Sequence, residues 1–538
     1  MKNKLYLPLF IALAIALGIF IGSFLNYPQG SSMNLFNGSP QEAKIKRLIN
    51  YIQYDYVEDV DTDSLLDGTI ANLLGKLDPH SVYIPASEHD AVAERMNGQF
   101  EGVGIQFRIV RDSLTVIKVV PGGPSEKAGI KDGDRILIAN QDTLYGKGID
   151  NDYIMRTLKG KAKTKVDMTI YRKTTGEYLD LRVRRGNIPD TSLKASYMLN
   201  DTLGYIKLDR FASTTYDEFK TALNQLQEEN LKDLVLDLRG NGGGYMGVAT
   251  QIVDEFLEKD KLIVFTKNKG GQIDKSFATA KGDFETGKIY VLIDENSASA
   301  SEIVAGALQD NDKGTIVGRR SFGKGLVQQE MELGDGSSVR LTVARYYTPT
   351  GRSIQKPYEG KNGKSYYQDL RLRLRNGELM NGDSIKVNDS LKFTTPKGKV
   401  VYGGGGIVPD VFVSIDTASY FSGYHVNVLN DFVFDYVDTH REEVHTWKWD
   451  DFMNNFDKND EMFIRYQAKF EAVIDSLYNG KVKGEIAARS KPFLKLYLKA
   501  LFAQMVFDEN SFYIVVNQND KMLQRVKELE GELNYIKQ

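Results

Sequence analysis

Three patterns of apolar spacing follow one another along the chain, and their order predicts its domain organisation. Between 41 and 77 the apolar residues recur as on one face of a helix, with a break near 59–63, which predicts two helices. From about 99 to 185 the apolar residues come in short runs that predict a small β-rich module. Its expected strands are 105–110, 114–120, 135–139, 166–171 and 178–183, with helices at 125–128 and 152–158.

The next stretch, 201–347, alternates strand-like and helix-like patterns. Expected strands are 203–208, 234–238, 262–266, 289–293, 315–317 and 326–333, and expected helices are 215–229, 245–256 and 301–309. Such alternation predicts an α/β domain around a buried sheet. Beyond Gly406 helical spacing returns at 426–437, 460–477, 492–507 and 520–536, so we expect an α-rich region of about 120 residues.

The N-terminus carries an uncharged apolar run of 21 residues, 5–25, directly after Lys2 and Lys4. At 1.5 Å per residue this run spans about 30 Å, the thickness of a bilayer core. The lysines favour an N-terminus on the inside, so the rest of the chain would be exported. A membrane anchor is our interpretation, and a cleaved signal peptide is the alternative. Residues 26–40, rich in Gly, Ser, Asn and Pro, are then a linker.

Composition narrows the chemistry that this chain can perform. Its 538 residues suggest several domains, and a net charge of −3 provides no broad basic surface for nucleic acid. It has no cysteine, which excludes cysteine nucleophiles, disulfides and Cys-type zinc sites. None of its five histidines lies between 90 and 424. We see no histidine–carboxylate pattern for a metal and expect neither a metal nor a cofactor.

Three polar segments of the α/β region carry the candidate chemistry. They are Asn-Ser-Ala-Ser-Ala-Ser-Glu at 296–302, Ser-Phe-Gly-Lys-Gly-Leu-Val-Gln at 321–328, and Arg-Gly-Asn-Gly-Gly-Gly at 239–244. A serine between a strand and a helix is exposed at the end of a sheet, where the helix N-terminus favours negative charge. Ser297, Ser299 and Ser301 are all candidates for such a nucleophile.

In the absence of a histidine, a lysine can be the base if burial keeps its amine neutral. Lowering a lysine pKa from about 10.4 to near 7 takes about 4–5 kcal/mol. Lys324 suits this role, since it lies between two glycines beside Phe322 at the start of an apolar strand. In an extended segment Gln328 would share its face and could hold the amine. The glycines at 242–244 could present a backbone N–H to a substrate carbonyl.

At these residues the chain resembles the C-terminal processing (tail-specific) proteases. Their signature is a Ser-Ala-Ser-Ala-Ser-Glu segment, a Phe-Gly-Lys-Gly segment about 25 residues later, and a glutamine four residues on. Here 25 residues separate Ser299 from Lys324, and four separate Lys324 from Gln328. The resemblance also includes 77–81 with Tyr83, the Gly-Gly-Pro segment at 122–134, and 405–410, and so covers about 41–415. It implies a nucleophilic Ser299, a base at Lys324, an orienting Gln328, and oxyanion donors at Ala300 N–H and Gly243 N–H.

Gly102, Val103, Gly104 and Ile105 resemble the carboxylate-binding loop of PDZ domains. Backbone N–H groups of such a loop hold a C-terminal carboxylate while the peptide adds as a strand. Because this module interrupts protease-like sequence, we expect the C-terminus of a protein or peptide substrate to bind there and to deliver the substrate to the protease or unlock it.

Plainer interpretations exist for each motif. Ser299 and Glu302 also form a helix capping box, and His80 is expected to be structural. The segment 318–324 mimics a phosphate-binding loop, but Gly325 replaces the Ser or Thr that would hold magnesium. The glycine pattern at 242–247 lacks the acidic partner of a dinucleotide site. The rival function is a non-enzymatic PDZ adaptor or chaperone-like binder on an inactive protease fold.

Together these observations predict a fold and a location. We expect an α/β protease core with an inserted PDZ-like β domain, N-terminal helices and an α-rich C-terminal region. The expected boundaries are 1–25 anchor or signal, 26–40 linker, 41–98 N-terminal helices, 99–186 PDZ domain, 187–415 protease core and 416–538 C-terminal helices. The expected location is the bacterial inner membrane with the catalytic part in the periplasm, or the soluble periplasm after signal cleavage. The oligomeric state, including a homo-oligomer, is left open.

Overall fold

The computed structural model describes residues 12, 17 and 39–536 except 359–365, 367, 417–422, 480–483 and 485. Apart from residues 12 and 17, the predicted anchor therefore lies outside the described residues, as does the predicted linker apart from residues 39 and 40. Across the described part of the chain, no helix has both the length and the apolar character needed to cross a membrane. The chain divides into two compact units, Met1–Ile70 and Ala71–Gln538.

Both N-terminal helices expected from the sequence are present. Helix α2 (Pro40–Asp55) begins at a capping box, in which the Ser39 hydroxyl accepts from Glu42 N at 3.3 Å and the Glu42 carboxylate accepts from Ser39 N at 3.2 Å. Helix α3 (Thr62–Leu74) follows after the expected break. A third helix, α4 (Ala86–Asn97), which the sequence pattern did not reveal, precedes the β-rich module.

The buried sheet of the α/β domain has six strands in the order β10-β11-β12-β15-β16-β21. Its strands are β10 (Leu193–Met198), β11 (Leu203–Leu208), β12 (Asp233–Asp237), β15 (Ile289–Ile293), β16 (Gly314–Gly318) and β21 (Val411–Phe412). Every pairing from β11 to β21 is parallel, and only β10 is antiparallel to its neighbour. The central strands are buried on both faces, which explains their continuous apolar runs.

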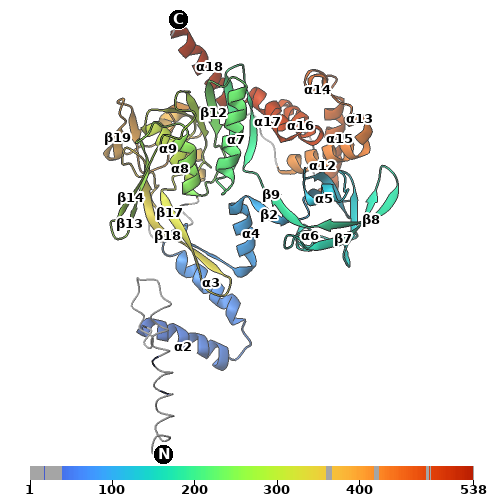
Figure 1. The fold of residues 1–538 in the computed structure, drawn as a ribbon, viewed down its shortest axis with the longest axis horizontal. Helices are drawn as coiled ribbons and strands as arrows, with labels where there is room; N and C mark the ends of the chain where they lie inside the picture. The colour runs from blue at the N-terminus through green and yellow to red at the C-terminus, as the bar shows by residue number, and fades with distance from the viewer. Residues whose placement is uncertain are drawn as a thin grey trace, which may run out of the picture. The chain divides into compact units, whose positions relative to one another are not determined.

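Different parts of the chain cover the two faces of this sheet (Figure 1). Helices α7 (Thr215–Glu228), α8 (Met246–Asp254) and α9 (Ala300–Asp310) pack on one face against alternate residues such as Leu234 and Val291. The intervening residues, such as Val235 and Leu292, face Met522, Leu523 and Val526 of α18 (Lys521–Ile536). The last helix of the chain is therefore a structural layer of the protease domain.

A second, antiparallel sheet stands beside the buried one. It contains β1 (Val82–Ile84), β13 (Leu262–Asn268), β14 (Ile273–Phe277), β17 (Leu326–Glu332) and β18 (Ser338–Tyr347). Strands β13 and β17 were expected in the buried sheet but belong here. Most of β17 is exposed or half-buried, as is typical of an antiparallel strand with one solvated face.

The β-rich module is the expected insertion. Its sheet has the order β3-β4-β5-β7-β8, formed by β3 (Ile105–Val110), β4 (Ser113–Val119), β5 (Arg135–Ala139), β7 (Lys165–Arg172) and β8 (Glu177–Arg184). The short strand β6 (Asp142–Thr143) pairs with β5, and α5 (Pro124–Lys127) and α6 (Asn151–Leu158) complete the module. Strands β2 (Gln99–Gly102) and β9 (Gly186–Pro189) pair where the chain enters and leaves it.

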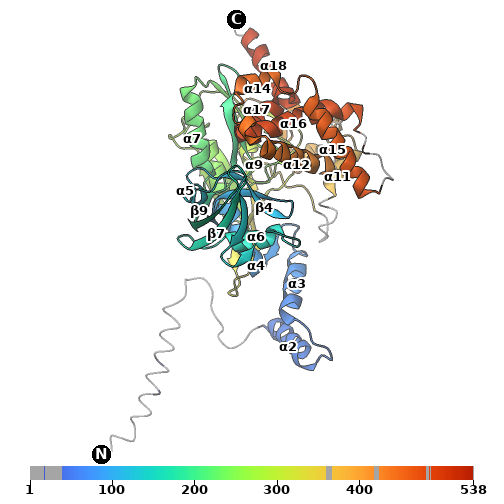
Figure 2. The same cartoon turned by 90° about the vertical axis from the view of Figure 1, so that its right-hand side faces the viewer.

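The C-terminal region is helical, as expected, and has its own core. Its helices are α12 (Gly423–Thr439), α13 (Arg441–Val444), α14 (Trp449–Asn455), α15 (Glu461–Leu477), α16 (Lys491–Val506) and α17 (Glu509–Val516). Figure 2 shows these helices together in orange and red. The segment between the protease strands and this region contributes α11 (Asp369–Arg375) and the hairpin β19 (Lys392–Thr394) and β20 (Val400–Tyr402).

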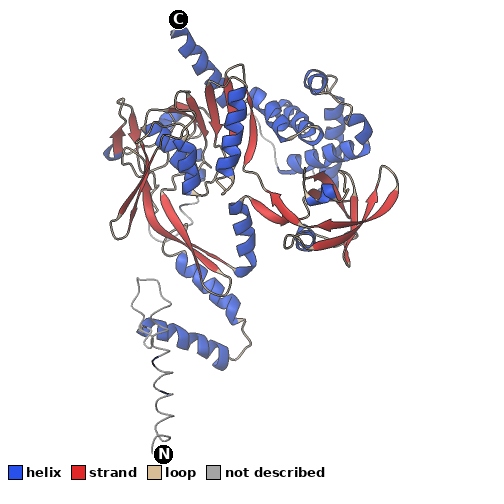
Figure 3. Ribbon diagram, viewed as in Figure 1, coloured by secondary structure: helices blue, strands red, loops and turns tan. Residues whose placement is uncertain are grey.

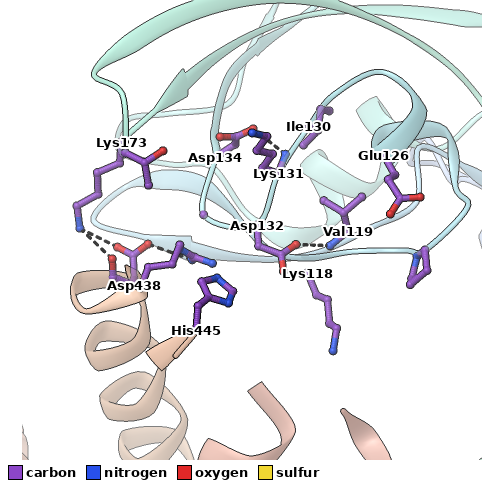
Figure 4. Close-up of a pocket in the computed structure, with 14 residues that line it drawn as sticks. Lys118, Val119, Glu126, Ile130, Lys131, Asp132, Asp134, Lys173, Asp438 and His445 are labelled. Atoms are coloured by element: carbon purple, nitrogen blue, oxygen red, sulfur yellow. Dashed lines mark hydrogen bonds and ion pairs between the residues drawn. The ribbon is translucent and has the colours of Figure 1, made fainter. Parts of the chain in front are cut away.

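The β-rich module contacts these helices rather than hanging free (Figure 3). Asp438 at the end of α12 is only 8% exposed and accepts hydrogen bonds from Arg135 Nη2 at 2.7 Å and from Lys173 Nζ at 3.1 Å. Figure 4 shows Asp438 and Lys173 at this contact, beside a cavity of about 500 Å³. Burial raises the pKa of Asp438, but the hydrogen bonds and charges of Arg135 and Lys173 lower it more, so that the pKa lies below its usual value. Arg441 lies 3.5 Å from the same carboxylate.

Candidate active site

Ser299 occupies the turn between β15 and α9, with φ 57° and ψ −113°. A positive φ is uncommon for a residue other than glycine, and here it forms a sharp turn that leaves the serine half-buried. Gly243 packs directly on this turn, because a Cβ added to it would lie 2.8 Å from Ser299 Cβ. The glycine at 243 therefore permits a close approach that a larger residue would prevent.

The structure separates the three candidate serines. The Ser297 hydroxyl is buried, donates to the Leu238 carbonyl at 2.8 Å and accepts from Asp294 N at 2.9 Å. The Ser301 hydroxyl is also buried and donates to the Asn241 carbonyl at 2.8 Å. Both hydroxyls thus hold the turn together, whereas Ser299 lies at its strained, partly exposed tip.

Lys324 lies in the loop just before β17, and its amine donates a hydrogen bond to Gln328 Oε1 at 2.8 Å. Gln328 in turn donates to the carbonyl oxygen of His80. Lys324 and Gln328 therefore meet as predicted, although Lys324 lies before the strand and the register of β17 shifts between Val327 and Gln328.

The Lys324 amine has a lowered pKa. Burial is the main cause, and the positive charge of Arg340 lowers the pKa further. The carboxylates of Glu302 and Asp78 act in the opposite direction, but do not reverse the shift. Neutral amine is therefore more accessible at Lys324 than at an exposed lysine.

A buried carboxylate links the serine segment to the lysine segment. Glu302 Oε2 accepts from Ser299 N at 2.9 Å and from Lys324 N at 2.8 Å. Its other oxygen accepts from the Ser321 hydroxyl at 2.5 Å and from Gly323 N at 2.7 Å. Burial raises the pKa of Glu302 while these four donors oppose the shift. The hydrogen bond from Ser299 N to the Glu302 carboxylate, which is one of the two bonds of the expected capping box, is therefore present. The same carboxylate also binds the segment that carries Lys324.

Tyr346 on β18 provides a second link between the two segments. Its buried hydroxyl lies 3.1 Å from the Ser299 carbonyl oxygen and 2.8 Å from the Lys324 carbonyl oxygen. Burial holds the Tyr346 pKa well above its ordinary value, so the hydroxyl stays a donor. Two side chains thus hold the backbones of Ser299 and Lys324 next to each other.

His80 lies at the edge of the site. Its ring Nε2 lies 2.9 Å from the Tyr366 hydroxyl, and its backbone N donates to Asp78 Oδ1 at 2.8 Å. Burial and the nearby Lys324 charge lower the His80 pKa to about 4. The imidazole is then neutral near pH 7, and the contact of His80 with the lysine–glutamine pair is through its carbonyl group.

The glycine-rich loop at 239–244 reaches the serine turn as expected. The Asn241 carbonyl oxygen accepts from Ala298 N at 3.0 Å and from Ser301 Oγ at 2.8 Å. The N–H of Gly243 donates to Asn241 Oδ1 at 2.9 Å, so in this conformation it points to a side chain within the loop. Ala300 N starts α9 on the other side of the same contact. Their roles as oxyanion donors stay predictions.

The predicted peptide-binding residues lie at one edge of the β-rich module. Gly102 ends β2, Val103 and Gly104 form the turn, and Ile105 begins β3. Strand β3 is an outer strand of its sheet, which leaves one edge available for an added strand. Binding by these four residues stays a prediction.

Several residues of the site had no signal in the sequence. Tyr346 and Tyr366 lie outside the motifs of the chain, and only the fold brings them to Ser299 and Lys324. Asp78 does lie in a segment of the family resemblance, 77–81, but that resemblance gave it no role. Glu302 was recognised as the last residue of the Ser-Ala-Ser-Ala-Ser-Glu segment and as part of a helix capping box, but the four hydrogen bonds that make it the centre of the site were not predicted. No group of metal-binding side chains is found among the residues that the structure describes.

Four segments of the chain match known protein families. Residues 202–360 match peptidase family S41, 102–183 match the PDZ domain, and 28–87 match the N-terminal domain of activating protease CtpB. Residues 420–508 match a family of unknown function, DUF8443.

Individual relatives are similar over the central part of the chain. Carboxy-terminal processing protease CtpB of Bacillus subtilis is 34% identical over 316 residues, which are 58% of this chain and 65% of that protein. The carboxy-terminal-processing protease of Bartonella bacilliformis is 34% identical over 324 residues, 59% of this chain and 74% of that protein. The solved photosystem II D1 C-terminal processing protease is 26% identical and covers 60% of this chain and 92% of its own, with a TM-score of 0.34.

The family matches and the similarity to the named relatives place the chain among the serine proteases that contain a PDZ domain. The chain belongs to the carboxy-terminal processing protease family, peptidase family S41. The chain spans 65% of the length of the Bacillus relative and 74% of the length of the Bartonella relative. The C-terminal helical region lies outside the S41 and PDZ matches.

Proposed function

We propose that this chain is a serine endopeptidase in which Ser299 is the nucleophile and Lys324 the general base. Ser299 Oγ bonds to the carbonyl carbon of the scissile peptide, and Lys324 Nζ takes the hydroxyl proton and passes it to the leaving amine. Water then hydrolyses the ester, again losing a proton to Lys324. Gln328 orients the amine, and the N–H groups of Ala300 and Gly243 bind the oxyanion.

The observation that carries this proposal is the shared carboxylate of Glu302. Because Ser299 N and Lys324 N donate to the same oxygen, at 2.9 and 2.8 Å, the backbones of nucleophile and base are neighbours. The Lys324 amine donates to Gln328 Oε1 at 2.8 Å, and the hydrogen bond between a base and its nucleophile commonly forms fully only when substrate is bound. Gly243 would serve as an oxyanion donor once its N–H turns from Asn241 to the substrate.

We infer that the substrates are exported proteins whose C-termini bind the PDZ domain at Gly102–Ile105. Two features support C-terminal recognition. Strand β3 is an outer strand of its sheet, and the PDZ domain is inserted into the protease chain. A model substrate with a free C-terminus should be cut faster than the same substrate with an amidated C-terminus. Equal rates would remove the case for C-terminal recognition.

We further infer that the apolar segment 5–25 anchors the chain in a bacterial inner membrane with the protease in the periplasm. The alternative is a soluble periplasmic protein made by signal cleavage. Alkaline extraction of membranes and sequencing of the mature N-terminus distinguish the two, because only an anchored chain stays with the membrane and keeps residues 5–25.

Cleavage of an unfolded substrate such as casein distinguishes a serine endopeptidase from a non-enzymatic PDZ adaptor. Ser299→Ala should abolish cleavage and keep peptide binding, whereas Ser297→Ala, at a hydroxyl that holds the turn, should retain cleavage by the folded fraction. An inactive wild-type chain that still binds peptide would favour the adaptor. Chelators and thiol reagents should have no effect on the rate.

A further inference from the structure

The C-terminal helix α18 reaches the loop that faces the nucleophile. Its first turn is capped by Asp520, whose Oδ1 accepts from Met522 N at 2.9 Å and from Leu523 N at 3.0 Å. The other oxygen, Oδ2, accepts from Arg239 Nη1 at 2.5 Å. A single carboxylate therefore begins the helix and binds the first residue of the glycine-rich loop.

Arg239 is held by several other groups at the end of strand β12. Its Nη2 donates to Asp237 Oδ2 at 2.6 Å, and its backbone N donates to Asp237 Oδ1 at 2.9 Å. Its carbonyl oxygen accepts from Lys207 Nζ at 3.1 Å. Asp520 is the component of this cluster that comes from the C-terminal region, 281 residues away along the chain.

The loop carries this constraint on to the serine turn. Two residues after Arg239, the Asn241 carbonyl accepts from Ala298 N and Ser301 Oγ, on either side of Ser299. Gly243 then packs against Ser299 Cβ. A continuous series of contacts thus runs from Asp520 through Arg239 and the loop to the nucleophile.

Besides capping α18, Asp520 contributes a negative charge to the cluster around Arg239. Asp237 is fully buried, and its pKa is lowered because Arg239 and Lys207 oppose the effect of burial. Without Asp520, two cations would face one carboxylate at the base of the loop. With Asp520, which is 18% exposed, the charges balance and Arg239 is bound from both sides.

We infer that Asp520 is a positioning residue for the glycine-rich loop, so that the C-terminal helix is a working part of the active site. This inference rests on the proposed function. It assigns a role to a segment beyond both the S41 and the DUF8443 matches. Loss of the Asp520 carboxylate should lower kcat with little change in KM, since the loop faces the reacting carbonyl rather than the distant part of a substrate.

The experiment uses the full chain with two variants and a matched control. Asp520→Asn and Asp520→Ser both keep a strong helix cap but remove the negative charge that binds Arg239. The control is Glu530→Gln on the same helix, where Glu530 binds Lys288 Nζ at 3.2 Å and the Tyr290 hydroxyl on the sheet. Cleavage of casein, the melting temperature and peptide binding to the PDZ domain are measured for each.

We expect both Asp520 variants to lower kcat about 10–100-fold, the size expected for a reacting group misplaced by about 1 Å. Asp520→Glu should restore part of the rate, and labelling of Ser299 by a fluorophosphonate should slow in parallel with kcat. The control should keep kcat within about twofold even if it melts at a lower temperature. PDZ binding should be unchanged throughout.

Two results would overturn the inference: Asp520 variants with wild-type kcat, or a Glu530→Gln variant that loses as much kcat as they do. If one Asp520 variant does not fold, the other is decisive. Ser299→Ala is assayed in parallel, so that failure of the proposed function is seen separately, as absent wild-type cleavage or as cleavage that survives without Ser299.

Discussion

Replacing Glu302 by glutamine probes how the site keeps its nucleophile and base together. The carboxylate is buried and accepts four hydrogen bonds, two on each oxygen. Glutamine has the same shape but only one accepting oxygen. Whichever way the amide turns, two donors would face an NH₂ group in place of an acceptor.

The cost can be estimated from these contacts. A buried donor left without an acceptor costs about 1–3 kcal/mol, so two cost about 2–6 kcal/mol. Removing a buried charge offsets part of this, because burial raises the pKa of Glu302 and so disfavours its ionised form. If at least 2 kcal/mol is spent on separating Ser299 from Lys324, kcat should fall about 30-fold or more.

The control is a second buried carboxylate, Glu255, whose side-chain and backbone donors are not residues of the active site. Glu255 accepts from the Tyr216 hydroxyl at 2.6 Å, Lys220 Nζ at 2.7 Å and Asp283 N at 3.0 Å. Glu255→Gln should lower the melting temperature and leave kcat of the folded protein unchanged. The measurements are kcat from steady-state cleavage and the melting temperature, for both variants and for the wild type. Should Glu302→Gln keep wild-type kcat, the carboxylate does not hold nucleophile and base together.

Three further predictions follow from the described contacts. Because Lys324 must be neutral and its pKa is lowered from that of free lysine, kcat/KM should rise with pH and level off below 10.5. His80, whose pKa is about 4, should add no step of its own to this profile near 6.5. Gly243→Ala should abolish cleavage, since the added Cβ would lie 2.8 Å from the serine turn, while PDZ binding persists. Asp310→Asn should destabilise the fold by about 3–5 kcal/mol in urea unfolding, because it leaves the fully buried Arg352 without its ion-pair partner.

Each of the three has an outcome that would contradict it. A kcat/KM that keeps rising up to pH 10.5 would mean that the catalytic base has the pKa of an ordinary lysine and not the lowered pKa of Lys324. Cleavage by Gly243→Ala at the wild-type rate would show that the loop moves freely from the serine turn. An Asp310→Asn variant as stable as the wild type would mean that Arg352 does not need the ion pair, and that its existing hydrogen bond to Gln309 Oε1, at 2.7 Å, is sufficient.

Much of the architecture could be predicted from the sequence, since its signals are local. Apolar runs and helical spacing placed β11 (Leu203–Leu208), β15 (Ile289–Ile293) and the four long C-terminal helices close to their observed bounds. The spacing of Ser299, Lys324 and Gln328 directed attention to the segments that the structure brings together. Strand β18 (Ser338–Tyr347) and helix α4 (Ala86–Asn97) were missed, because neither contains a fully buried stripe.

The sequence by itself determined the local elements and which residue types could perform hydrolysis. Only the tertiary structure decided that Glu302 joins serine to lysine, that the His80 carbonyl holds Gln328, and that α18 forms the second cover of the sheet. The reason is physical. A backbone segment folds according to its own pattern of apolar and polar residues, but a buried charge takes its partners from whatever the packing brings near, and for Arg239 that partner is 281 residues away.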